Sequence, residues 1–157
     1  MPITALVPWA VLLIFLGWAA FVDGKKKMLP LEPLWLIFGF ALLWAFVIGH
    51  VVDALMGAAF WFAWTGGLWY LSAGRWMGFA DLWLTAATGA WLGVTASLEA
   101  WYFTYVVIGP LVVILAFSGL IKKPQRIAFA PMLLGGVLLA FLSQGRLLAW
   151  FAQALQG

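Results

Sequence analysis

The stretch Ala73-Gly-Arg-Trp-Met-Gly-Phe-Ala-Asp-Leu-Trp-Leu-Thr-Ala-Ala-Thr-Gly-Ala-Trp-Leu-Gly93 places a short polar loop directly before an apolar helix. The loop carries one cation, Arg75, and Asp81 stands where the loop becomes the helix. A carboxylate at the edge of a membrane helix is energetically expensive, and this makes Asp81 a candidate functional residue. The rest of the chain decides whether this helix lies in a membrane and which groups accompany Asp81.

The composition indicates an integral membrane protein. Of the 157 residues, 67% are hydrophobic and only 8% are charged, whereas a soluble domain carries about 25% charged residues. The chain has no cysteine and one histidine, so we expect no disulfide, no metal site and no cofactor. The net charge of +3 comes from short basic clusters between apolar segments. This pattern indicates membrane topology and no nucleic-acid partner.

Six apolar segments meet or approach the roughly 20 residues that a membrane-spanning helix needs. Ser97 and Glu99 are expected to form the turn between the fourth and fifth segments, and Gly109-Pro110 is expected to kink the fifth. With no repeat or linker, residues 1–157 are predicted to form a single domain, an all-α bundle of about six transmembrane helices. The expected spans are 3–22, 34–49, 51–71, 82–96, 98–121 and 127–148.

Positive charge gathers in alternate loops. The loops 23–30, 72–80 and 122–126 hold seven of the eight Lys and Arg residues, and six spans would place these loops on one side of the membrane. Cytoplasmic loops are enriched in Lys and Arg. We therefore expect a multi-pass protein of the inner (plasma) membrane, with the basic loops in the cytoplasm and both termini outside.

Two acidic residues stand at the expected cytoplasmic boundary, Asp23 at the end of the first span and Asp81 at the start of the fourth. Asp23 has a plain interpretation as a solvated loop residue. Asp81 has one as a helix cap that accepts backbone N–H groups. As a pair they suit peptide hydrolysis, because two carboxylates within hydrogen-bond reach share one proton. The ionised carboxylate then activates water, and the protonated one polarises the scissile carbonyl.

No other catalytic pattern is present in the sequence. It contains no glycine-rich phosphate loop and no HExxH motif, and one histidine cannot complete a Ser-His-Asp set on the cytoplasmic side. The remaining acidic residues, Glu32, Asp53 and Glu99, are expected to be solvated helix ends. The aspartate pair is therefore the one catalytic candidate.

Three motifs resemble those of the type IV prepilin peptidases and preflagellin peptidases, which are GxGD-type intramembrane aspartyl proteases. The first is Asp23-Gly-Lys-Lys-Lys-Met-Leu-Pro30, where the family has an aspartate, a basic stretch and an aliphatic-proline pair. The second is Met77-Gly-Phe-Ala-Asp81, where the family has Met-Gly-x-Gly-Asp. The third is Arg126-Ile-Ala-Phe-Ala-Pro131, similar to the Ile-Pro-Phe-Gly-Pro opening of the family's last helix.

The resemblance covers nearly the whole chain, as a divergent minimal catalytic domain, and implies that Asp23 and Asp81 are the catalytic aspartates of an endopeptidase. The implied substrate is a prepilin-like protein of type IV pilus assembly or protein secretion. Its basic leader would be removed at the cytoplasmic face, just before its own apolar helix. Larger bacterial members also N-methylate their product through an N-terminal extension with a cysteine-bound metal. We expect no methyltransferase activity here.

The residues expected to contact the substrate flank the two aspartates. Two of them, Gly74 and Gly78, are expected to let the loop 72–80 move. The chain departs from the motif at Ala80, where the family has a glycine that permits unusual backbone angles. This departure keeps open an inactive relative that acts as a membrane assembly or scaffold subunit. A small transporter is a separate alternative. The full expected set is Gly74, Gly78, Ala80, Lys25, Lys26, Lys27 and Pro30.

Overall fold

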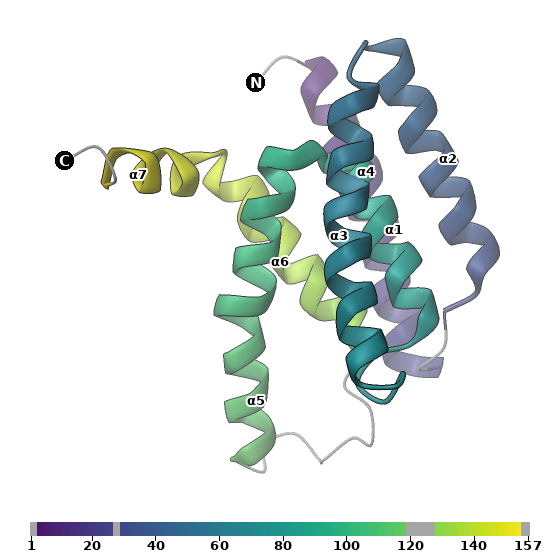
Figure 1. Cartoon of the computed structure of the whole chain (residues 1–157), viewed down its shortest axis with the longest axis vertical. Coiled ribbons are helices and arrows are strands. Elements are labelled where there is room, and N and C mark those ends of the chain that lie inside the picture. The colour runs from purple at the N-terminus through teal and green to yellow at the C-terminus, as the bar shows by residue number, and fades with distance from the viewer. Residues whose placement is uncertain (1–2, 27–28, 119–127, 155–157) are drawn as a thin grey trace.

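The computed structural model describes residues 3–26, 29–118 and 128–154, and every regular element within them is a helix (Figure 1). Long, apolar helices lie side by side, and a short helix at the C-terminal end runs away from them. The elements are α1 (Ile3–Lys26), α2 (Leu31–Val47), α3 (Val51–Leu71), α4 (Phe79–Tyr102), the π-helix η1 (Phe103–Ile108), α5 (Gly109–Phe117), α6 (Phe129–Ser143) and α7 (Arg146–Ala154).

Three helical stretches among the described residues are long and apolar enough to cross a membrane: Val7–Lys26, Val51–Leu71 and Phe79–Leu115. The bent pair α6 and α7 makes a fourth if it is counted as one span. The all-helical fold is thus confirmed, with three to four candidate spans among the described residues where the sequence predicts six. The count differs because α2 has only 17 residues and because Phe79–Leu115 forms one run of helix.

That long run is broken at Gly93, whose φ of 69° and ψ of −174° are accessible only to glycine. The carboxylate of Asp53, from α3, accepts the N–H of Val94 at 3.0 Å and so caps the segment that follows. That segment runs on through η1 and α5 in a new direction (Figure 1). The turn expected at Ser97 and Glu99 is therefore wrong, because both residues are buried within helix.

The irregularity expected at Gly109-Pro110 takes the form of a π-helix. Proline lacks a backbone N–H and cannot continue an α-helical hydrogen-bond ladder. The six residues before Gly109 adopt π geometry, and regular α-helix resumes with Pro110 in its first turn. Buried Thr104 in this π-helix bonds the Ala100 carbonyl oxygen at 2.7 Å. Such π-helical turns recur at functional sites.

The tightest helix contact joins α3 to α4 through Gly57 and Gly89. A Cβ atom at either position would collide with the backbone of the other, so the two helices approach as closely as backbones allow. The apolar core beside this contact includes the fully buried Trp61, Leu84 and Leu133, from α3, α4 and α6.

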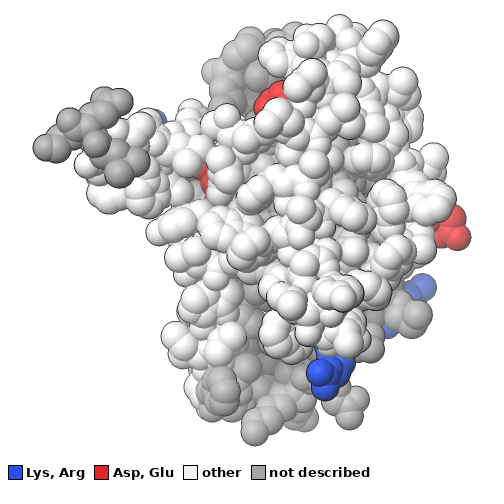
Figure 2. All heavy atoms as spheres, in the orientation of Figure 1, with Lys and Arg blue, Asp and Glu red and all other residues white. Residues whose placement is uncertain are grey.

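Charge is confined to small parts of the surface. On the face drawn in Figure 2 nearly all atoms are uncharged, and most of the visible Lys and Arg atoms gather at its lower end. Large apolar side chains face outward along the helices, with Ile14, Phe46 and Tyr70 each more than 70% exposed. Such a surface suits lipid rather than water.

Candidate functional site

Asp23 lies inside α1, near its C-terminal end, and is only 8% exposed. Its Oδ2 accepts the backbone N–H of Ala130 at 3.1 Å. Ala130 belongs to the first turn of α6, whose own N-cap residue, Ala128, has no side chain that can bond the helix. Asp23 therefore caps α6 from a different helix. The interpretation of Asp23 as a solvated loop residue is wrong, because α1 continues past the expected end at residue 22 and buries the carboxylate.

Asp81 occupies the first turn of α4 and is also 8% exposed. Its Oδ2 accepts the N–H of Gly78 at 2.8 Å, and this reaches back to the residue that precedes the helix. The carboxylate also sits at the positive end of the helix dipole. The capping role predicted for Asp81 is confirmed.

Asp23 and Asp81 lie at the same end of the bundle, which we call the Asp81 end, although 58 positions separate them in the sequence. They are near enough there for their charges to repel each other. Within the described residues, each carboxylate uses Oδ2 for a backbone N–H, and neither Oδ1 makes a hydrogen bond to another described group. The second oxygen of each residue is thus the group that could bind water, a proton or a substrate carbonyl.

Tyr105 is a polar residue of this region that the sequence interpretation overlooked. Its ring packs against Trp61, Trp64, Trp101 and Phe129 at centroid distances of 5.8–6.3 Å. The buried hydroxyl makes no hydrogen bond of good geometry to a described residue, although the Trp64 indole lies beside it, and the charge of Asp81 acts on it. A tyrosine within an apolar segment is the signal that could have identified it.

A buried hydroxyl pair lies next to Asp81 on the adjoining faces of α3 and α4. Thr65 Oγ1 and Thr85 Oγ1 are 2.9 Å apart, and Thr85 also bonds the carbonyl oxygen of Asp81 at 3.0 Å. The pair links α3 to the first turn of α4. Thr88 and Thr104 bond carbonyl oxygens of their own helices, as the sequence predicts for hydroxyls in apolar segments. All four hydroxyls are therefore satisfied by protein, and the Thr65–Thr85 pair also joins two helices.

The loop before α4 is built around Gly74, whose φ of 71° favours glycine. Arg75 folds back, and its backbone and side-chain N–H groups both donate to the Ser72 carbonyl oxygen. Gly78 is extended, with φ −79° and ψ 158°, so its conformation does not require glycine. Ala80 lies in the first turn of α4 and has no positive φ, so alanine fits the backbone where the family motif has glycine.

The basic motif residues lie near Asp23. Lys25 and Lys26 end α1 and are exposed, and Lys25 Nζ stands 4.3 Å from the centre of the Phe21 ring. Pro30 is the N-cap of α2 and is exposed. Lys27 lies outside the described residues. The positions 25, 26 and 30 therefore share the Asp81 end with the aspartate pair.

The third motif provides the partner of Asp23. Its described part, Ala128-Phe-Ala-Pro131, opens α6, and Ala130 donates the N–H that Asp23 accepts. Pro131 has no N–H to satisfy in this first turn. The motif thus forms a helix start with few unsatisfied backbone N–H groups. One of these groups, that of Ala130, donates to the carboxylate of Asp23 from α1. Residues 126 and 127 lie outside the described residues.

The other end of the bundle, which we call the Asp53 end, holds single carboxylates. Exposed Asp53 caps the segment after Gly93, as described above. Glu99 is 2% exposed and accepts three hydrogen bonds, from Ser143 Oγ at 2.5 Å and from the N–H groups of Gly145 and Leu148 at 3.2 Å. The expectation that Glu99 is solvated is wrong, because it caps α7 from inside the protein. Glu32 is exposed, as predicted.

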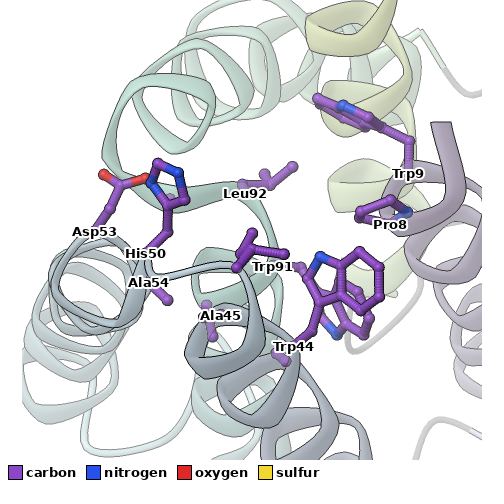
Figure 3. Close-up of a pocket in the computed structure, with 13 residues that line it drawn as sticks. Pro8, Trp9, Trp44, Ala45, His50, Asp53, Ala54, Trp91 and Leu92 are labelled. Carbon is purple, nitrogen blue, oxygen red and sulfur yellow. The ribbon is translucent and has the colours of Figure 1, made fainter. Parts of the chain in front are cut away.

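A cavity of about 270 Å³ opens at the Asp53 end, away from the aspartate pair (Figure 3). Figure 3 shows His50 and Asp53 on one side of it and Pro8 and Trp9 across from them. Within the described part of the chain, no cluster of three or more His, Asp or Glu side chains could hold a metal ion. The cavity offers aromatic walls and one carboxylate.

Comparisons with known proteins assign no family or function to this chain. No family model, curated protein or solved structure matches the chain. The functional argument therefore depends on the residues at the Asp81 end.

Proposed function

We propose that this chain is an intramembrane aspartyl endopeptidase that removes the basic leader of prepilin-like substrates. The observation that carries the proposal is that two buried carboxylates, Asp23 and Asp81, come from distant parts of the chain and lie at the same end of the bundle. Two neighbouring carboxylates repel each other, and burial strengthens that repulsion. A neutral Asn or Ser would cap a helix about as well, so capping alone does not account for a pair of acids.

The chemistry follows from one proton shared by the pair. The ionised carboxylate takes a proton from water as the water oxygen attacks the scissile carbonyl carbon, and the protonated carboxylate donates to the carbonyl oxygen. Proton transfer to the amide nitrogen then lets the C–N bond break. The backbone N–H groups of Gly78 and Ala130 hold Oδ2 of each aspartate, which leaves Oδ1 of each for the reaction.

The proposed topology has six spans, both termini outside and the Asp81 end in the cytoplasm. Lys25, Lys26 and Arg75 lie in or beside the loops of that end, as the positive-inside rule requires. A prepilin-like substrate would place its apolar helix against the bundle in lipid and its leader at the cytoplasmic surface. The extended peptide between them needs protein or water for its backbone hydrogen bonds. The loop 72–80 beside Asp81 is the proposed wall of this site.

A second candidate function is a catalytically inactive membrane scaffold subunit. One observation favours it: both aspartates make hydrogen bonds of a kind that hold helices together, with Asp23 joining α1 to α6 and Asp81 capping α4. A scaffold needs the acceptor oxygens and not the acid. The two functions therefore differ in what an aspartate-to-asparagine change does.

The test is co-expression of the full chain with a prepilin-like substrate that carries a basic leader. Asp23→Asn and Asp81→Asn keep an acceptor oxygen for the cap but remove the acid, and we expect each to slow leader cleavage about 10²–10⁴-fold. Asp53→Asn is the matched control, because it changes a capping carboxylate at the other end, and it should cleave at the wild-type rate. Cleavage at the wild-type rate by either Asp23→Asn or Asp81→Asn would contradict the peptidase proposal and favour the scaffold function.

A further inference from the structure

The C-terminal helix α7 leaves the bundle. It has nine residues and no buried side chain, and it leaves α6 at a bend of 70°. Figure 1 shows it running sideways from the bundle. At 1.5 Å per residue it is about 14 Å long, too short to cross a bilayer.

The residues of α7 divide into two faces. Leu147, Trp150, Phe151 and Ala154 follow the i, i+3, i+4, i+7 spacing of one helical face. Arg146 and Gln153, seven positions apart, flank this stripe on the side of Trp150, and Ala149 and Ala152 lie opposite it. Trp150 remains 61% exposed, and the Phe151 ring contacts Tyr102 of α4 at a centroid distance of 6.0 Å. The apolar face is thus only partly covered by protein.

A buried carboxylate sets the direction of α7. Glu99 binds the N–H groups of Gly145 and Leu148, and Ser143 donates to the same carboxylate from the end of α6. Gln144 and Gly145 between the helices have φ values of 51° and 81°, which break the helix. Hydrogen bonds and backbone conformation therefore fix the bend between α6 and α7.

The bend between α6 and α7 lies near one end of the bundle. Glu99 is five residues after Val94, where the helix segment that follows Gly93 begins, and this distance is about 8 Å along the helix axis. If the long helices cross the bilayer, the start of α7 is close to the membrane boundary. Leu142, in the last turn of α6, is 68% exposed and joins the apolar face of α7 to the outward-facing surface of the bundle.

We propose that α7 lies in the plane of the membrane, at the boundary between acyl chains and headgroups nearest the Asp53 end. Its apolar face would enter the acyl region, with Trp150 at the edge of that face, at the depth where tryptophan is enriched, and with Arg146 and Gln153 beside it at the level of the headgroups. The occupant of the exposed face of α7 is thus the bilayer that the long helices span. This inference does not depend on the proposed peptidase activity.

The absence of cysteine makes a direct test possible. Single cysteines are introduced along α7 of the full chain, labelled with a nitroxide, and studied in vesicles of phosphatidylethanolamine and phosphatidylglycerol. Collision with oxygen, which concentrates in lipid, and with a water-soluble nickel chelate is measured by electron paramagnetic resonance. Labels at Leu142 and Arg75 serve as references for the span and for water.

We expect oxygen collisions to be highest at Trp150 and Ala154 and nickel collisions to be highest at Ala149 and Ala152, with the 3.6-residue period of a helix. The oxygen-rich positions should share one depth. Three results would overturn the proposal: high nickel collision at Trp150, a depth that increases steadily along α7, or spin–spin broadening at Trp150, which would mean that a second copy of the chain covers the face.

Discussion

Among the described residues, both ends of the bundle use carboxylates to cap helix starts, but only one end brings two carboxylates near each other. At the Asp53 end, Asp53 and Glu99 each cap a helix start alone. At the Asp81 end, Asp23 and Asp81 also bond backbone N–H groups at helix starts, but there the two carboxylates interact with each other. Capping is therefore a general use of acid in this protein, and pairing occurs at one end.

The number of bonds that each carboxylate makes sharpens the contrast. Glu99 uses both oxygens for three hydrogen bonds and is fully engaged in holding α7. Asp23 and Asp81 each use one oxygen among the described contacts. A residue whose hydrogen-bonding capacity is fully used has a structural task. A repelling pair with unused capacity is the arrangement expected for chemistry.

The largest expected effect comes from changing both members of the pair. If Asp23 and Asp81 act as one unit, the double variant Asp23→Asn with Asp81→Asn should lose about as much cleavage, 10²–10⁴-fold, as either single variant. Rates of leader removal by the three variants provide the comparison. Losses that multiply in the double variant would mean that the two residues act independently.

Gly93 tests the turn at the Asp53 end. Gly93→Ala forces alanine into a glycine-only conformation and drives its Cβ into the Asp53 carboxylate, and we expect the free energy of unfolding to fall by about 1–3 kcal/mol. Gly49→Ala is the matched control, because its φ is 77° but nothing lies near the added Cβ. Thermal unfolding in detergent measures both. Equal losses of unfolding free energy in the two variants would show that the contact between Asp53 and the turn adds nothing to stability.

A smaller effect is expected from the hydroxyl of Tyr105. Tyr105→Phe removes a buried hydroxyl on which the charge of Asp81 acts, and cleavage should slow about fivefold, as for one ordinary hydrogen bond of about 1 kcal/mol. Tyr102→Phe changes a tyrosine that packs against Phe103 and Phe151 instead. Its rate should equal that of the wild type, and an equal loss in both variants would remove Tyr105 from the site.

The smallest effect is expected at Ala80, where the chain departs from the family motif. The backbone there is helical and has no positive φ, so Ala80→Gly gains no needed freedom and should lower the free energy of unfolding by about 0.5–1 kcal/mol. Cleavage should stay within about twofold of the wild-type rate, the size of a few tenths of a kcal/mol. A large gain in cleavage would show that alanine restricts the site.

Features that depend on local sequence were the ones predicted correctly. The expected span 51–71 coincides with α3, and Asp81 lies at a helix start, as its place between loop and apolar run indicates. Apolar run length and helix-start residues are local signals. The all-helical fold follows from them.

Features that depend on distant partners were missed. Asp23 caps Ala130, which is 107 positions away, and Glu99 caps residues 46 and 49 positions away. A carboxylate that accepts the N–H groups of a distant helix start leaves no pattern in the nearby sequence. Glu99 was therefore predicted to be solvated and to lie in a turn. The real turn, at Gly93, depends on a cap supplied by Asp53 from another helix.

The most direct test of the central claim is infrared spectroscopy of the full chain in lipid at neutral pH, which detects the C=O band of protonated carboxyl groups. A proton shared by Asp23 and Asp81 predicts a band that weakens in Asp23→Asn and equally in Asp81→Asn, because the remaining aspartate stays buried but no longer faces a negative neighbour. The band should persist at full strength in Asp53→Asn. A band that is unchanged in both Asp81-end variants, or none in the wild type, would contradict a shared proton.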